Sequence, residues 1–135
     1  MRPARDDDAL RLVLEDASMG RWEGPRDLLT STGADWDRRL FRLQVLAEAG
    51  ARLRFADTWA KAEPRSPHAL ALLANVQALR AMIAGQSGGR SLMEEAWATC
   101  RTALGVWPDD VAPLLVMLAL LRTVNGHVVL PVGGQ

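Results

Sequence analysis

The hydrophobic pattern between Pro64 and Pro108 predicts two antiparallel helices joined by a short loop. In the first helix, which begins at Pro67, apolar residues recur at steps of three and four, and these steps align them in one stripe of an amphipathic helix. The residues of this stripe are Ala69, Leu72, Leu73, Val76, Leu79 and Ile83. After a glycine-rich break at residues 85–89, a second stripe follows at Leu92, Ala96, Cys100 and Ala103. Such a hairpin cannot bury its own stripes, so further helices are expected to pack against it.

More helices are predicted on both sides of this hairpin. The first follows the aspartates at residues 6–8, which suit an N-cap and a first helical turn, and it ends at Gly20. Three others are expected over residues 21–32, after Asp35 and after Gly50, and the last spans residues 111–124 with Asp110 as its N-cap. The predicted fold class is all-α, with about seven helices stacked as antiparallel hairpins in a single domain over residues 1–126. Residues 127–135 are predicted to be an apolar C-terminal tail, in which Val128–Leu130 is a weak candidate for a strand.

Composition narrows the class of protein. Hydrophobic residues make up 49% of the chain and charged residues 24%, which is ordinary for a globular protein. The 16 basic residues balance the 16 acidic ones, so no overall field attracts nucleic acid or anionic lipid. The longest apolar run, Val111 to Leu121, has eleven residues, whereas a helix that crosses a membrane needs about 20. With a single cysteine and no apolar signal-peptide core near Met1, the sequence predicts a cytoplasmic protein without membrane or nucleic-acid partners.

A basic and aromatic cluster is predicted on the helix that follows Asp35. Arg38, Arg39 and Arg42 fall on one side of this helix, and Trp36 lies beside them. Guanidinium and indole groups at this spacing suit a carboxylate or phosphate of a partner, so these four residues are the candidate partner-binding site. Acidic residues nearby in the sequence also allow an ordinary salt-bridged surface, and contact with nucleic acid is the least favoured of the three interpretations.

No group of residues has the spacing of a catalytic, cofactor or metal site. Cys100 lies on an inward stripe, where a thiol is either an inert small hydrophobe, which we favour, or a reactive group. His68 and His127 lack ligand spacing to Cys100 or to each other. The segment at residues 85–90 lacks the lysine of a phosphate-binding loop and is interpreted as a flexible linker. The sequence therefore favours a protein that is not an enzyme and needs no cofactor.

The tryptophans support a second hypothesis. The chain has five Trp and no Tyr, and indole rings gathered in a cleft would bind an apolar ligand. With Trp22, Trp36 and Trp59 as its walls, such a pocket would make the chain a small helical enzyme or a ligand carrier. The alternative is that these side chains belong to the core.

The C-terminal helix is predicted to mediate self-association. Its apolar residues point in every direction, although no later helix is predicted to cover its outer face. An exposed apolar face of this size is rare on a soluble monomer, so we expect a homodimer in which two copies of the helix pack together. The candidate contact residues are Leu114, Leu115, Leu118 and Leu121. The alternatives are that a different protein docks there, or that the chain is a shortened relative of a longer repeat array.

Several motifs resemble the tetratricopeptide repeat, a family of stacked helical hairpins. The matches to the second helix of such a repeat are Ala96, Cys100, Ala103 and Pro108. Residues 20–23 (Gly-Arg-Trp-Glu) resemble the start of another second helix. The chain departs from the family in the loop at residues 85–90, which adds about ten residues to the usual repeat of about 34, and in Trp59, which replaces a small residue. The resemblance, to a divergent member of actinobacterial type, implies a short right-handed solenoid that binds a peptide or another protein in a concave groove. It implies no chemistry.

Overall fold

Seven α-helices account for the part of the chain that the structure describes, residues 7–124 of a computed structural model. They are α2 (Asp8–Ser18), α3 (Glu23–Thr32), α4 (Trp36–Gly50), α5 (Phe55–Ala62), α6 (Pro67–Ala84), α7 (Gly89–Val106) and α8 (Val111–Val124). No strand occurs within residues 7–124, so the predicted all-α class is confirmed. The predicted tail at residues 127–135, with its candidate strand and His127, lies outside the described residues.

Short-range signals in the sequence set the helix ends. At the start of α2, the Asp7 side chain accepts a hydrogen bond from the backbone N–H of Leu10 at 3.0 Å. At the start of α6, the Ser66 hydroxyl accepts one from the N–H of Ala69 at 3.2 Å. Both contacts satisfy N–H groups that a helix start leaves unpaired. Gly85 ends α6 with a φ of 61°, which glycine adopts without strain.

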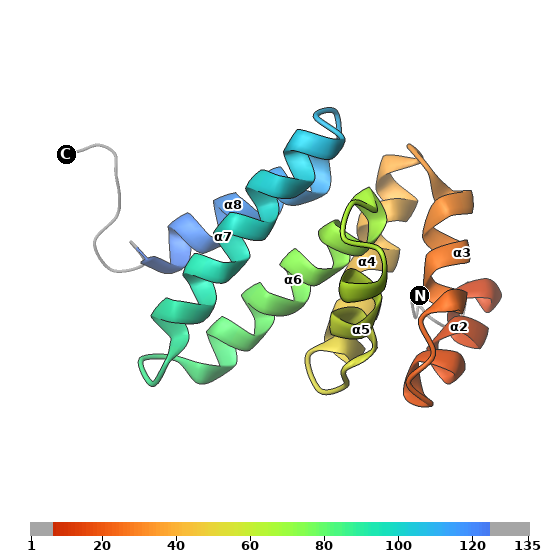
Figure 1. Cartoon of the computed structure of the whole chain (residues 1–135), viewed down its shortest axis with the longest axis horizontal. Helices are drawn as coiled ribbons and strands as arrows, with labels where there is room; N and C mark the ends of the chain where they lie inside the picture. Colours follow the sequence, from red (N-terminus) through yellow and green to blue (C-terminus); the bar gives the residue numbers. More distant parts are fainter. Residues whose placement is uncertain (1–6, 125–135) are drawn as a thin grey trace.

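Helix α6 is the centre of the structure. Figure 1 shows it across the middle of the molecule, and it packs against α3, α4, α5, α7 and α8. Its buried residues are Ala69, Leu70, Ala71, Leu72, Ala74, Val76, Ala78 and Ala81. The prediction of an amphipathic helix with one apolar stripe is therefore wrong for α6, because this helix has neighbours on several sides. Ile83, assigned to that stripe, is 76% exposed instead.

Small residues allow the helices around α6 to approach closely. A Cβ atom added to Gly50, the last residue of α4, would lie 2.7 Å from Cγ2 of Val76. One added to Gly89, in the first turn of α7, would lie 2.9 Å from the backbone oxygen of Ala81. The absence of a side chain at Gly50 therefore allows α4 to pack closely against α6. The segment between α6 and α7 is a short turn whose glycines include Gly88 at a φ of 89°.

The apolar interior consists of two clusters that meet at α6. The larger cluster joins α2 to α6 and contains the fully buried side chains of Phe55 and Trp59. The smaller cluster lies between α6, α7 and α8, and it is built mainly from small residues. Its buried members are Ala74, Ala78, Ala96, Cys100, Val116 and Leu120. The inward stripe predicted for α7 is confirmed at Ala96, Cys100 and Ala103.

Enlarging Ala96 should destabilise the smaller cluster. Its side chain is fully buried between α6 and α7, so Ala96→Leu would overpack the contact and lower the free energy of unfolding by about 1–3 kcal/mol. Urea denaturation followed by circular dichroism measures the change. Ala98→Leu, at an exposed position of the same helix, is the matched control and should change it little. Equal stability of the two variants would contradict the packing described for Ala96.

Candidate interaction surface

The predicted partner-binding residues do not form one surface. Arg39 is fully buried and Arg42 is 8% exposed, whereas Arg38 is exposed and Trp36 is half-buried. This corrects the expectation of an exposed arginine cluster. The side of α4 that carries Arg39 and Arg42 turns into the molecule because both guanidinium groups pair with carboxylates from distant segments. Contact of a partner with Trp36 and Arg38 stays a prediction.

Arg39 joins α4 to the start of α6 and to the loop before α8. Its Nε donates to Oδ1 of Asp110 at 3.1 Å and its Nη2 donates to Oδ2 at 2.7 Å, and both residues are buried. Its Nη1 lies 2.7 Å from Nδ1 of His68. Its Cζ atom lies 4.9 Å from the centre of the Trp107 ring, which places the cation over the indole. One side chain therefore contacts two segments that are far apart from α4 and from each other in the sequence.

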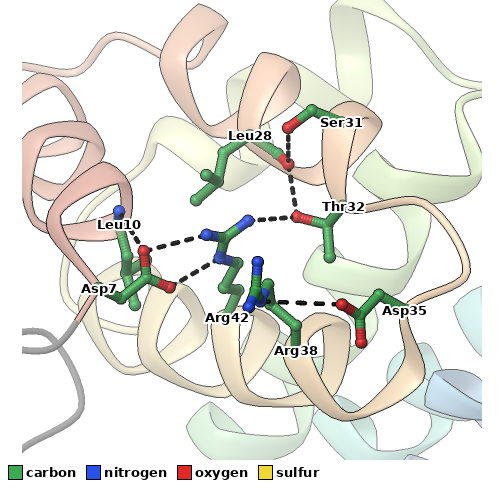
Figure 2. A network of polar contacts seen from close by, with 8 residues as sticks. All are labelled: Asp7, Leu10, Leu28, Ser31, Thr32, Asp35, Arg38 and Arg42. Carbon is green, nitrogen blue, oxygen red and sulfur yellow. Dashed lines mark hydrogen bonds and ion pairs between the residues drawn. The ribbon is translucent and has the colours of Figure 1, made fainter.

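Arg42 makes a similar connection about one turn further along α4. Figure 2 shows its guanidinium between Asp7 and Thr32. Nε donates to Oδ2 of Asp7 at 2.7 Å, Nη2 donates to Oδ1 at 3.0 Å, and Nη1 donates to the Thr32 hydroxyl at 2.7 Å. The hydroxyl in turn donates to the backbone oxygen of Leu28 in α3 at 2.6 Å. The pKa of Asp7 is held below its usual value, chiefly by the hydrogen bonds from Arg42.

Both carboxylates also cap a helix. Asp7 accepts the N–H of Leu10 at the start of α2, and Asp110 accepts the N–H of Ala112 at the start of α8, 3.1 Å from its Oδ1. Arg39 and Arg42 therefore tie α4 to the N-termini of α8 and α2. Truncation of one partner in a buried pair leaves the other charge uncompensated and typically costs about 3–5 kcal/mol. These arginines position helices.

Arg80 forms a third connection, which the sequence pattern did not indicate. It extends from α6 to the end of α4, where Nη2 donates to the backbone oxygens of Gly50 at 2.9 Å and Leu53 at 3.0 Å. The same guanidinium pairs with both carboxylate oxygens of Asp57 at 3.0 and 2.9 Å. Cationic groups favour the C-terminal end of a helix, where backbone oxygens lack partners. A single arginine within an apolar helix was the only sign in the sequence.

His68 is held in its neutral form. The Arg39 guanidinium only donates hydrogen bonds, so Nδ1 of His68 must accept and Nε2 must carry the ring hydrogen. The pKa of His68 is lowered from 6.5 to about 4, first by burial of the ring and second by the positive charge of Arg39. The negative charge of Asp110 raises this pKa but does not outweigh the other two effects. Protonation would place two positive charges in contact and break this hydrogen bond.

Stability should therefore fall as the solution is acidified from pH 6.5 to about 4. In this range the unfolded chain takes up a proton on His68 that the folded chain excludes. The contribution of neutral His68 to the free energy of unfolding is therefore complete above pH 6.5 and is lost as the pH falls to about 4. We expect a loss of about 1–3 kcal/mol in the free energy of unfolding, allowing for the part of the ring that faces solvent. Urea titrations at several pH values measure it.

The control for this prediction is His68→Gln, whose amide oxygen can still accept from Arg39 but does not titrate. The variant should lose less stability over the same range. Below pH 3.8 both proteins should weaken further as Asp7 becomes protonated, because its pKa is lowered in the fold. Identical pH profiles for the wild type and the variant would contradict the assigned role of His68.

The tryptophans named as pocket walls are divided between two places. Trp59 is fully buried and stacks on Trp22, with ring centres 6.3 Å apart and planes 6° apart. Trp36 lies instead against Trp107, with ring centres 5.4 Å apart, in the group around Arg39. The structure does not bring Trp22, Trp36 and Trp59 together.

The outer face of α8 is an exposed apolar ridge. Ala112, Val116 and Leu120 are buried on one side of the helix. On the opposite side, four leucine side chains are between 45% and 54% exposed. They are the predicted self-association residues Leu114, Leu115, Leu118 and Leu121. The expectation that this face stays uncovered by the rest of the described chain is therefore confirmed, whereas self-association itself stays a prediction.

A groove runs along each side of this ridge. The larger one has a volume of about 730 Å³ and lies between the end of α6, the start of α7 and the end of α8. Its apolar walls include Met82, Met93, Trp97, Leu120 and Leu121. The smaller one, of about 230 Å³, lies between α4, α6 and α8, and Met82 and Leu115 line it. The sequence pattern did not single out Met82, Met93 and Trp97, although the apolar residues of α6 outside the predicted stripe indicated further contacts.

Neither a cluster of metal-ligand side chains nor an activated thiol occurs among the described residues. Residues 7–124 contain no group of His, Cys, Asp and Glu that could hold a metal ion. Burial raises the pKa of the Cys100 thiol to about 12, so it stays protonated and unreactive near neutral pH.

None of the described helices combines the length and the hydropathy that a membrane span requires. Comparisons with protein-family models, with curated proteins and with solved structures gave no significant match.

Proposed function

We propose that this chain is a non-catalytic interaction module that binds another protein through the leucine face of α8. One observation carries the proposal: four leucines stand exposed in a row on a helix whose other side is packed in the core. An apolar face of this kind typically marks a contact site for a partner. The buried arginines support the proposal indirectly, because the tie between Arg39 and Asp110 fixes the start of α8.

The free energy of association indicates how large the contact surface must be. Complete burial of a leucine is worth about 1.5–3 kcal/mol, so four half-exposed leucines supply about 3–6 kcal/mol. Association itself costs at least about 4 kcal/mol in lost translational and rotational freedom. The leucines alone therefore give a weak complex. A stable one must also cover the groove walls formed by Met82, Met93 and Trp97, which we include in the proposed contact surface.

The proposed scaffold for this surface is a short tetratricopeptide-like stack of hairpins. Helices α2, α4, α6 and α8 contact one another in that order, as the first helices of successive repeats do in such a stack. The smaller groove, between α4, α6 and α8, would then lie on the concave side.

A second candidate function is ligand binding in the larger groove, since its volume of about 730 Å³ suits a small molecule. An apolar ligand there should change the fluorescence of the wild type, and Trp97→Phe should lose that response.

The self-association predicted from the sequence belongs to this proposal and gives it a direct test. Wild-type chain at micromolar concentration should elute as a dimer with twice the 14.7 kDa mass of one chain, as measured by light scattering after size exclusion. Leu118→Glu should shift it toward monomer, because a charge would be buried in the interface. The matched control is Leu12→Glu, at a leucine of α2 that is 64% exposed and away from α8.

The control should remain dimeric. A dimer that survives Leu118→Glu, with circular dichroism unchanged, would show that the leucine face of α8 is not the contact surface.

A further inference from the structure

We infer that two copies of this chain pack with their α8 helices antiparallel across a two-fold axis, and that Arg122 of each copy pairs with Asp109 of the other. The inference rests on the interaction function proposed above and adds the partner and its orientation. It follows from the few charges along α8.

Two exposed charges flank α8, one near each of its ends. Arg122 is in the last turn of α8, and it shares the side of Leu118 because residues four apart lie on the same face of a helix. Asp109 lies two residues before the helix begins. Neither of these residues forms an ion pair with another residue between positions 7 and 124. No charged residue occurs between Val111 and Leu121.

This arrangement of charges selects one orientation. Parallel packing of two α8 helices would place Arg122 beside Arg122 and Asp109 beside Asp109, and it would align the two helix dipoles. Antiparallel packing brings each arginine to the aspartate end of the other helix and opposes the dipoles. The position midway between Asp109 and Arg122 falls beside Leu115, so pairing the charges also brings the leucine rows together.

The shape of the surface suits the same symmetry. A two-fold contact requires one patch to match itself, so the patch must contain both a projection and a recess. The face of α8 meets this condition, since the exposed leucines stand beside grooves of about 730 and 230 Å³. The leucine ridge of one copy can therefore lie against a groove of the other, which buries the Met82 wall that both grooves share.

Charge reversal tests the orientation. We expect Arg122→Glu and Asp109→Arg each to raise the dissociation constant of the dimer on the order of tenfold, because each variant places like charges together at two symmetric positions. The double variant, with both changes, should recover an affinity close to that of the wild type. Sedimentation equilibrium measures the constants, and high salt should reduce the differences between variants. Arg101→Glu, at an exposed position of α7, is the control and should not alter the constant.

Two results would contradict the inference, and they have different consequences for the proposed function. A wild-type chain that is monomeric at micromolar concentration would exclude the second copy as the partner, together with the dimer included in the proposed function. A dimer with the same affinity in both single variants and the double variant would exclude the antiparallel pairing alone. In that case the proposed contact surface would still stand if Leu118→Glu dissociates the dimer.

Discussion

The ion pair between Arg39 and Asp110 is the contact on which the arrangement of the helices depends. It joins residues 71 positions apart in the sequence, and both side chains are withdrawn from solvent. Asp110 also caps α8, and Arg39 also bonds His68 at the start of α6. A shift of any of these elements would leave a buried charge without its partner. Because a buried ion pair seldom adds more stability than apolar residues would, its main contribution is to select one arrangement. Arg42 has the same effect on α2 through Asp7.

The extent to which the sequence predicted this fold has a physical explanation. Helix ends depend on contacts within a few residues, so Asp7, Gly20 and Gly85 indicated them correctly. Periodicity identifies the buried side of a helix with one solvent-facing side, as in α7. It fails for α6, which is enclosed by neighbours, and there it misassigned the exposed Ile83. Charged residues were assumed to face solvent, and that assumption placed Arg39 and Arg42 on the surface.

Only half of the role of Asp110 was accessible from the sequence. Its position just before an apolar segment identified it as an N-cap, which the bond to Ala112 confirms. Its second partner lies on a helix distant in the sequence, and no local pattern encodes such a pairing. The exposed face of α8 was predictable because apolar residues point in every direction around this helix, so those on the side away from its neighbours must face outward. Fixing the start of α8 through Asp110 leaves Ala112, Val116 and Leu120 inside and turns the leucines outward.

A double-mutant cycle on Arg39 and Asp110 tests the central claim most directly. Arg39→Met removes the cation and keeps an apolar stem, while Asp110→Asn removes the charge and keeps a side chain that can cap α8. Urea denaturation gives the free energy of unfolding for the wild type, both single variants and the double variant. We predict that each single variant loses about 3–5 kcal/mol and that the double variant loses about 2–3 kcal/mol less than their sum. Additive losses would show that the two side chains are not coupled and would contradict the central role of this ion pair in arranging the helices.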